Sequence, residues 1–254
     1  MVRRIIWQGI EYTWFKSYDY GERVAFDFQF CAIPLSSGFA FRTLTALIET
    51  HYLPSLAYFS AIYGAKEILL ERCEYYVKQT YRNRCRINAA NGEMKLVVPV
   101  KSKGNKARIV DVRLDFTQKW LNNHWRTVQS AYGKAPFFEH YENDLHETLF
   151  KKVEFLYDLN YMLLSMCLRW LKWSMPIRET EFYADQAPND VLDLRLAINP
   201  KKLEQCHQFY YPVAYNQVFG NTFVENLSLI DLVFCEGPGA SGIVQASAIQ
   251  KMNK

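Results

Sequence analysis

The sequence lacks the cysteine and histidine spacings that build a zinc site on one short segment. It has no C-x-x-C pair and no H-E-x-x-H motif. The six cysteines are scattered, at positions 31, 73, 85, 167, 206 and 235. A chain of 254 residues can also bury enough core to be stable without disulfide staples. We therefore expect no metal site, and reduced thiols in a cytoplasmic protein.

Long hydrophobic runs are missing as well. The most apolar window, LNYMLLSMCLRWLKW at residues 159–173, contains Asn160, Arg169 and Lys172. It is shorter than the roughly 20 apolar residues that span a membrane and is typical of a buried helix. The arginines at positions 3 and 4 are not followed by the continuous apolar segment of a signal peptide. These features predict neither a membrane span nor export by a signal peptide.

The common nucleotide-binding fingerprints are also absent. No G-x-x-x-x-G-K-[ST] motif occurs, which excludes a P-loop. GPGASG at residues 237–242 matches G-x-G-x-x-G, but only 12 residues follow Gly242. A dinucleotide fold needs this motif at the start of a βαβ unit, so we reject it as a Rossmann fingerprint.

Positive charge is present but unevenly spread. The net charge is +4, yet the segment from Arg72 to Arg108 holds ten Lys or Arg against two acids, Glu74 and Glu93. This asymmetry indicates a localised anion site more than a general affinity for polyanions. The alternative is that these cations only keep a β-rich surface soluble.

The pattern changes near residue 43. Residues 1–42 are rich in aromatics and have no clear period, so we expect an extension of uncertain structure, or a start site placed too early. From Leu44 a predicted strand, a helix ending at Gly64 and the strand KEILLERC form a βαβ unit. We therefore predict one domain over residues 43–254, with an α/β fold: a Rossmann-like mixed sheet, a β-hairpin and a largely helical C-terminal half.

Further elements follow from local signals. Asn91-Gly92 between two extended runs predicts a hairpin, and the alternation in IVDVRLDF predicts a strand at residues 109–116. Helical spacing predicts one helix from Lys119 to Gly133, a longer one over residues 143–173 and a short one in LSLIDLVF at residues 227–234.

The stretch YVKQTYRNRC, Tyr76 to Cys85, is the best candidate for an anion site. On a strand, Lys78, Arg82 and Arg84 would share one face with Thr80 and Arg86. On a helix, Lys78, Arg82 and Arg86 would still align. Arginine can bind a phosphate or a carboxylate through two hydrogen bonds. The residues alone are compatible with two interpretations, an anion site and a plain solvated face.

HWRTVQSAY, His124 to Tyr132, is a second concentration of polar and aromatic residues. His124 is the best-placed candidate for proton transfer near neutral pH. A lone histidine on a helix is, however, more often structural than catalytic.

Several ordered motifs cover the chain from about Leu44 to its end. They are HYLPSLAYF (51–59), YVKQTYRNRC (76–85) followed by ANG and LVVPV, HWRTVQSAYGKAPFFEHYE (124–142), FLYDLN (155–160), DLR (193–195), YPVAYNQVF (211–219) and NLSLIDLVFCEGP (226–238). Together they resemble the WbqC-like protein family of bacterial polysaccharide gene clusters. Cys235 departs from the family pattern, which has asparagine before Glu-Gly-Pro.

The resemblance implies a role in O-antigen biosynthesis, for which glycine transfer to a sugar is a suggested activity. Amide formation of this kind needs an activated carboxylate, which carries phosphate, and an amine freed of its proton. We expect no permanently bound cofactor, with ATP or an aminoacyl donor as co-substrate. The expected partner is a phosphate-bearing small molecule, such as a nucleotide-sugar or an activated amino acid.

The resemblance also suggests roles for individual residues. His124 is the expected general base, and Lys78, Arg82 and Arg84 are expected to hold phosphate. The other expected substrate-binding residues are Tyr52, Gln79, Asn83, Arg126, Tyr132 and Gln217. Asp193 with Arg195, and Asp231 with Glu236, are expected to fix loops.

Two alternatives of other classes remain. One is a non-catalytic module that binds a nucleotide-sugar or a partner of the polysaccharide enzymes. The other is an RNA-binding accessory protein, suggested by tyrosines interleaved with the basic segment. Nucleic acid is the less favoured partner, because the net charge is small and its asymmetry indicates a localised anion site. RNA binding would depend steeply on salt, whereas binding in a confined pocket would depend on it only modestly.

Overall fold

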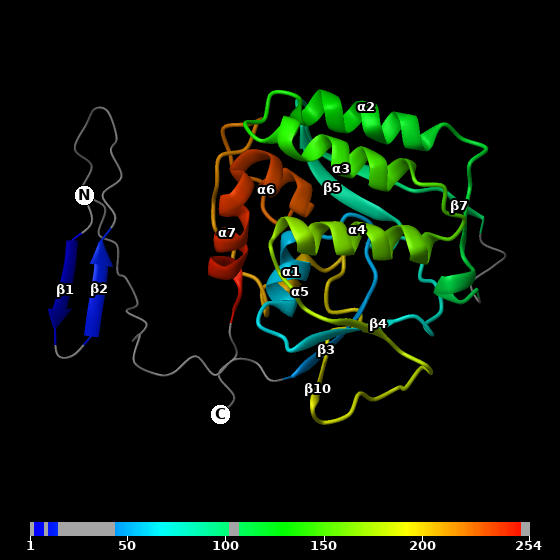
Figure 1. The fold of residues 1–254 in the computed structure, drawn as a ribbon, viewed down its shortest axis with the longest axis horizontal. Coiled ribbons are helices and arrows are strands. Elements are labelled where there is room, and N and C mark those ends of the chain that lie inside the picture. The colour runs from blue at the N-terminus through cyan, green and yellow to red at the C-terminus, as the bar shows by residue number, and fades with distance from the viewer. Residues whose placement is uncertain (1–2, 8–9, 15–43, 102–106, 250–254) are drawn as a thin grey trace. The chain divides into compact units, whose positions relative to one another are not determined.

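A computed structural model describes residues 3–7, 10–14, 44–101 and 107–249 (Figure 1). The chain divides into two units, Met1–Phe41 and Arg42–Lys254. In the first unit, β1 (Arg3–Trp7) pairs with β2 (Ile10–Trp14) in an antiparallel hairpin. The rest of the expected extension lies outside the described residues, and a single domain over residues 43–254 stays a prediction.

The second unit contains a four-stranded sheet in the order β10, β3, β4, β9. These strands are β10 (Val191–Asp193), β3 (Thr45–Glu49), β4 (Glu67–Glu71) and β9 (Ile177–Glu179). All neighbours in this sheet are parallel. α1 (Leu56–Ile62), buried at every residue, connects β3 to β4. The predicted βαβ unit and the α/β fold class are therefore confirmed.

The predicted hairpin is also confirmed. β5 (Arg84–Ala89) pairs antiparallel with β6 (Gly92–Val97), and Ala89 lies opposite Gly92. Gly92 has a φ of 96°, which glycine adopts readily because it has no Cβ. A short pair, β7 (Val100–Lys101) with β8 (Arg113–Leu114), completes the antiparallel elements. The lysine-rich loop at residues 102–106 lies outside the described residues.

The strand predicted over residues 109–116 is mostly wrong. Ile109–Asp111 forms the short 3-10 helix η1, and only Arg113–Leu114 is extended. The alternation of valine, leucine and charged residues in this stretch does not decide its conformation. Instead, the N–H of Ile109 donates to the carbonyl of Glu74 at 3.0 Å, and residues 112 and 114 form backbone hydrogen bonds with residues 156 and 154.

α2 (Trp120–Tyr132) ends at Gly133 as predicted. The single helix predicted over residues 143–173 is wrong, because the chain breaks into α3 (Phe138–Phe150) and α4 (Leu156–Trp170). At the break, the N–H of Leu114 donates to the carbonyl of Glu154 at 2.8 Å and the N–H of Leu156 donates to the carbonyl of Val112 at 2.9 Å. These contacts pull residues 154–156 out of a helix whose side-chain pattern would otherwise continue.

The remaining helices are α5 (Leu203–Cys206), α6 (Leu229–Glu236), η2 (Gly237–Gly239) and α7 (Ala240–Ser247). α6 confirms the short helix predicted near residues 227–234. α3 contacts α2 and α4, beside which it lies in Figure 1, and α4 contacts α6. The helices and the sheet share one hydrophobic core. The loop after β4 leads from the sheet to the candidate site.

Two sequence-based expectations concern the whole described chain. Cys73, Cys85, Cys167, Cys206 and Cys235 are free thiols, as expected, and Cys31 lies outside the described residues. Among the helices of the described ranges, none has the length and apolar character needed to cross a membrane.

Candidate anion-binding site

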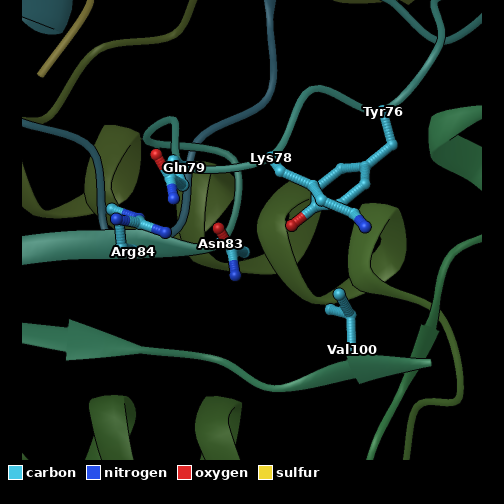
Figure 2. A pocket seen from close by; sticks show the side chains of 6 residues that line it. All are labelled: Tyr76, Lys78, Gln79, Asn83, Arg84 and Val100. Carbon is cyan, nitrogen blue, oxygen red and sulfur yellow. The ribbon is translucent and has the colours of Figure 1, made fainter. Parts of the chain in front are cut away.

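A pocket lies where the loop that follows β4 turns into β5. It has a volume of about 270 Å³ and is lined by Tyr76, Lys78, Gln79, Asn83, Arg84 and Val100 (Figure 2). Four of these residues, Lys78, Gln79, Asn83 and Arg84, were predicted as substrate-binding residues. The loop leaves the carboxyl end of a parallel strand, the edge where α/β sheets most often bind ligands.

The backbone of this segment differs from the regular strand considered for residues 76–85. β5 begins only at Arg84, and residues 78–83 form turns and bends. Gln79 has a φ of 61°, an uncommon value for a residue with a side chain. Strained positions of this kind gather at functional sites. The turns bring Lys78 and Arg84 to one pocket although they are six positions apart.

Both cations of the pocket lack a carboxylate partner in the described ranges. Neither Lys78 nor Arg84 forms an ion pair there, and the buried Nε of Arg84 has no hydrogen-bond acceptor. Burial raises the pKa of the Tyr76 hydroxyl, and the positive charges of Arg84 and Arg82 partly oppose this rise. The pocket thus presents positive charge that a bound anion can neutralise.

Arg82 does not line the pocket, which corrects its expected contact with substrate. Its side chain is buried, and its Nε and Nη2 donate to the two oxygens of Glu74 at 2.7 and 2.5 Å. Nη1 donates to the hydroxyl of Thr80 at 3.2 Å, and Nη2 lies 3.4 Å from Oε1 of Glu49. Arg82 therefore holds the pocket loop against the carboxyl end of the sheet.

Glu49 is the centre of a buried polar network at that edge. It is the last residue of β3 and 1% exposed. Its carboxylate lies 3.4 Å from Nε2 of His51 and accepts the N–H of Leu196 at 3.1 Å. Burial alone would raise the pKa of Glu49, but the His51 hydrogen bond and the charge of Arg82 outweigh it and lower the pKa to about 2. Glu49 is thus ionised at neutral pH and connects the loops after β3, β4 and β10.

Glu71 also accepts hydrogen bonds from several loops. It lies on the neighbouring strand β4, opposite Glu49 in the register. It accepts the N–H of Cys73 at 2.9 Å, the hydroxyl of Thr180 at 2.7 Å and Nη1 of Arg195 at 3.2 Å. Arg195 also donates to the carbonyl of Ala184 at 2.7 Å and to Asp193. This geometry agrees with the expectation that Asp193 and Arg195 fix loops.

Sequence reasoning did not single out Glu49, Glu71 or His51. A signal for the two acids was present, because each lies within two residues of the end of a predicted strand of one parallel βαβ unit. Carboxyl ends of neighbouring parallel strands meet at one edge of a sheet.

His124 does not line the pocket. It is buried on α2, and its Nδ1 lies 3.0 Å from the hydroxyl of Tyr52, which is also buried. Burial lowers the pKa of His124 to about 4, against a hydrogen bond with the backbone of Val97. His124 and Tyr52 therefore form an interior pair, and neither lines the pocket with Lys78 and Arg84.

Tyr132 and Gln217 belong to another interior network, around Asp231 of α6. The carboxylate of Asp231 accepts three hydrogen bonds. The donors are the hydroxyl of Tyr132 at 2.7 Å, the hydroxyl of Tyr215 at 2.6 Å and Nε2 of Gln217 at 3.2 Å. Burial raises the pKa of Asp231, and these three hydrogen bonds oppose the rise. Gln217 also pairs with the backbone of Val224. The network connects α2, α6 and the segment at residues 215–224.

Arg126 lines a second pocket, with a volume of about 300 Å³. This pocket lies between the hairpin turn and α2 and is lined by Ala89, Ala90, Asn91, Met94, Arg126, Thr127, Ser130 and Ala131. Arg126 does not line the pocket of Lys78 and Arg84. The structure thus brings together four of the predicted site residues and places the other six in four different surroundings.

The family comparison covers most of these elements. Residues 50–203 match the model of the WbqC-like protein family. The chain belongs to the WbqC-like protein family. The match confirms the resemblance seen in the sequence, and it includes the whole pocket, Arg82 and Arg195. Gln217 and Asp231 lie beyond it.

One curated relative of this WbqC-like protein is the uncharacterized protein Rv1507c of Mycobacterium tuberculosis. The two are 32% identical over 94 residues, which are 37% of this chain and 40% of the relative. The chain therefore spans about two fifths of the curated relative it matches. No solved structure matches this WbqC-like chain. Within the described ranges, no group of three or more His, Cys, Asp or Glu is arranged to hold a metal ion.

Proposed function

We propose that this WbqC-like protein binds a phosphate-bearing small molecule in the pocket of Lys78 and Arg84 and transfers an aminoacyl group, glycyl, to a sugar in the cytoplasm. The supporting observation is that Lys78 and Arg84 line one pocket and that neither is neutralised by a carboxylate in the described part of the chain. The sugar belongs to surface-polysaccharide (O-antigen) biosynthesis, which is the setting implied by the family.

The chemistry of amide formation uses such a pocket directly. The amine nitrogen of the sugar attacks the activated carbonyl carbon, the new C–N bond forms and the bond from carbon to the phosphate oxygen breaks. The electron pair of that bond leaves with the phosphate, and the amine gives up a proton. The activated donor carries phosphate, and so does a sugar phosphate or nucleotide-sugar acceptor, and two cations can hold the phosphate of either substrate. ATP or an aminoacyl donor would enter as a co-substrate.

One observation favours a second candidate function, a non-catalytic module that binds a nucleotide-sugar. The six residues that line the pocket include neither a carboxylate nor a histidine to take the amine proton. His124, the base expected from the sequence, forms its hydrogen bond with Tyr52 in the interior. A module would need the cations and the amides of the pocket but no base.

Ligand binding is tested by thermal shift and titration calorimetry with ATP, UDP, nucleotide-sugars and free glycine. We expect phosphate-bearing compounds to raise the Tm of the wild type and free glycine to leave it unchanged. The Arg84→Gln variant should lose the shift. Arg126→Gln removes a cation from the other pocket and is the matched control, which should keep it. An unchanged shift in Arg84→Gln would contradict the proposed site.

A transfer assay distinguishes the two proposed functions, an enzyme and a binding module. The protein is incubated with labelled glycine, ATP and an amino-sugar nucleotide, and the sugar product is analysed by mass spectrometry. Glycyl transfer that is lost in Arg84→Gln supports the transferase. A chemically prepared glycyl adenylate is tested as a donor as well, so that transfer is measured independently of activation. Binding without transfer from either donor supports the module.

A further inference from the structure

The orientation of the Asn83 side chain is fixed by the backbone. Its Nδ2 donates to the carbonyl of Val98 at 2.9 Å, and a carbonyl can only accept a hydrogen bond. The amide nitrogen must therefore face Val98, and Oδ1 must face away from it (Figure 2). Asn83 is 6% exposed, and its Oδ1 has no hydrogen-bond partner among the residues that the structure describes.

Arg84 presents the complementary group in the same pocket. Its Nε–H is a buried donor without an acceptor. Buried polar groups are nearly always hydrogen-bonded, so each unsatisfied one calls for an explanation. Here an acceptor and a donor on adjacent residues line one pocket. A ligand that offers both a hydrogen-bond donor and an anionic acceptor satisfies both.

The charge of the pocket selects the kind of donor. Lys78 and Arg84 are positive, and none of the six lining residues is acidic. An ammonium group next to Asn83 would be repelled by both cations, whereas a hydroxyl carries no charge. The volume of about 270 Å³ is slightly below the range for drug-sized ligands, roughly 300–1,000 Å³. It suits one phosphorylated sugar unit better than a whole nucleotide-sugar.

We infer that the pocket binds the phosphorylated sugar itself, with phosphate at Lys78 and Arg84 and a sugar hydroxyl donating to Oδ1 of Asn83. Asn83 is then the specificity-determining residue that separates a sugar phosphate from other phosphates. This inference rests on the proposed function and assigns the pocket to the acceptor substrate. The ammonium-bearing aminoacyl donor approaches from outside the pocket.

Two pairs of compounds test this assignment on the wild-type protein by calorimetry. The first pair is glucose 1-phosphate and cyclohexyl phosphate, which share a six-membered ring and a phosphate but differ in hydroxyl groups. The second pair is 2-hydroxyethyl phosphate and 2-aminoethyl phosphate, which differ only in hydroxyl against ammonium. We expect the hydroxyl-bearing member of each pair to bind about tenfold more tightly, the effect of leaving one buried polar group unpaired.

The Asn83→Ala variant tests the residue. It should bind glucose 1-phosphate and cyclohexyl phosphate equally, because the acceptor is gone. This ratio of affinities does not change with a general loss of stability, so it reports on Oδ1 and not on folding. Arg126→Gln, the control, should keep the tenfold preference.

The outcomes separate this inference from the proposed function. Suppose that the wild type binds both members of each pair equally and that Arg84→Gln binds neither. This result would overturn the sugar assignment but would still support a phosphate site at Arg84. Tighter binding of 2-aminoethyl phosphate would overturn the assignment of a hydroxyl donor to Oδ1 of Asn83. If no phosphate compound bound, the proposed function and the inference would both be wrong.

Discussion

At the scale of single residues, Arg82 is the clearest case of a buried charge that depends on its partners. Its guanidinium is 1% exposed and is held by Glu74 and Glu49. Removing one member of a buried ion pair leaves the other charge without compensation, which costs about 3–5 kcal/mol. We predict that Arg82→Gln lowers the free energy of unfolding by about that amount in urea denaturation monitored by circular dichroism.

The matched control is Arg169→Gln. Arg169 also pairs with a carboxylate, Asp144 at 2.9 Å, but its side chain is 61% exposed. Exposed pairs contribute less than about 1 kcal/mol. Equal losses in the two variants would contradict the view that Arg82 anchors the pocket loop through burial.

His124 gives a prediction for the pH dependence of stability. Burial lowers its pKa in the folded protein to about 4, below the ordinary value of 6.5. The unfolded chain therefore takes up this proton first, and the stability contribution of His124 is complete above pH 6.5 and lost as the pH falls towards 4. The difference corresponds to at most about 3 kcal/mol. We expect the stability of His124→Gln to fall less than that of the wild type between pH 7 and pH 4.5.

Urea denaturation at several pH values in this window measures the effect. Glu49, with its pKa lowered to about 2, keeps its full contribution to stability above pH 4.5 and loses it only as the pH falls from 4.5 towards 2, so its window lies below the measured range. The exposed His140 provides the control, and His140→Gln should follow the wild-type curve. Parallel curves for His124→Gln and the wild type would show that His124 is not held neutral by burial.

At this scale, sequence reasoning could group residues that lie on one short segment. Lys78, Gln79, Asn83 and Arg84 line one pocket because they lie within seven positions of each other. The environments of Arg82 and His124 could not be predicted, since their partners Glu49 and Tyr52 come from the end of β3 and the loop after it. No local pattern states which distant carboxylate or hydroxyl will meet a given side chain.

At the scale of elements, the same distinction separates the confirmed predictions from the wrong ones. β3, α1, β4, the hairpin and α2 have periods and end signals within their own residues, and the structure contains all of them. The long helix over residues 143–173 failed because residues 154–156 bond to residues 112 and 114. Tertiary hydrogen bonds override helix propensity when the alternative leaves backbone groups of another segment unpaired.

The end of α6 depends on one glycine. Gly237 has a φ of 52°, and a Cβ built there would lie 2.4 Å from a ring atom of Phe137, at the start of α3. Alanine at this position would be strained and would also displace the ring. We predict that Gly237→Ala lowers the free energy of unfolding by about 2 kcal/mol or more, measured by urea denaturation.

Gly242→Ala is the matched control, because it makes the same chemical change five positions later within α7. A Cβ at Gly242 meets nothing within 4 Å. Alanine favours a helix over glycine by up to about 1 kcal/mol, so this variant should be as stable as the wild type or more so. Destabilisation of both variants to the same extent would contradict a specific contact between α6 and Phe137.

At the scale of the whole molecule, the basic segment from Arg72 to Arg108 carries less unpaired positive charge than its sequence suggests. Arg72, Arg82, Arg86 and Lys101 pair with carboxylates. In the described ranges, the members of this segment without an ion pair are Lys78, Arg84, Lys95 and Arg108. The charge therefore supports a confined pocket more than a broad surface for a polyanion.

This distribution predicts how binding depends on salt. A single strand of RNA held by four cations would lose about 50-fold in affinity between 50 and 200 mM salt, because each neutralised phosphate releases counterions. A small phosphate in the pocket has no such ion atmosphere and is subject only to screening, so its affinity should fall less than about fivefold. Calorimetry with glucose 1-phosphate and fluorescence anisotropy with a labelled oligouridine over this range compare the two. An RNA-binding protein would be favoured over the pocket if oligouridine bound more tightly than glucose 1-phosphate and its affinity depended more steeply on salt. Its affinity would then also fall in both Arg84→Gln and Arg108→Gln.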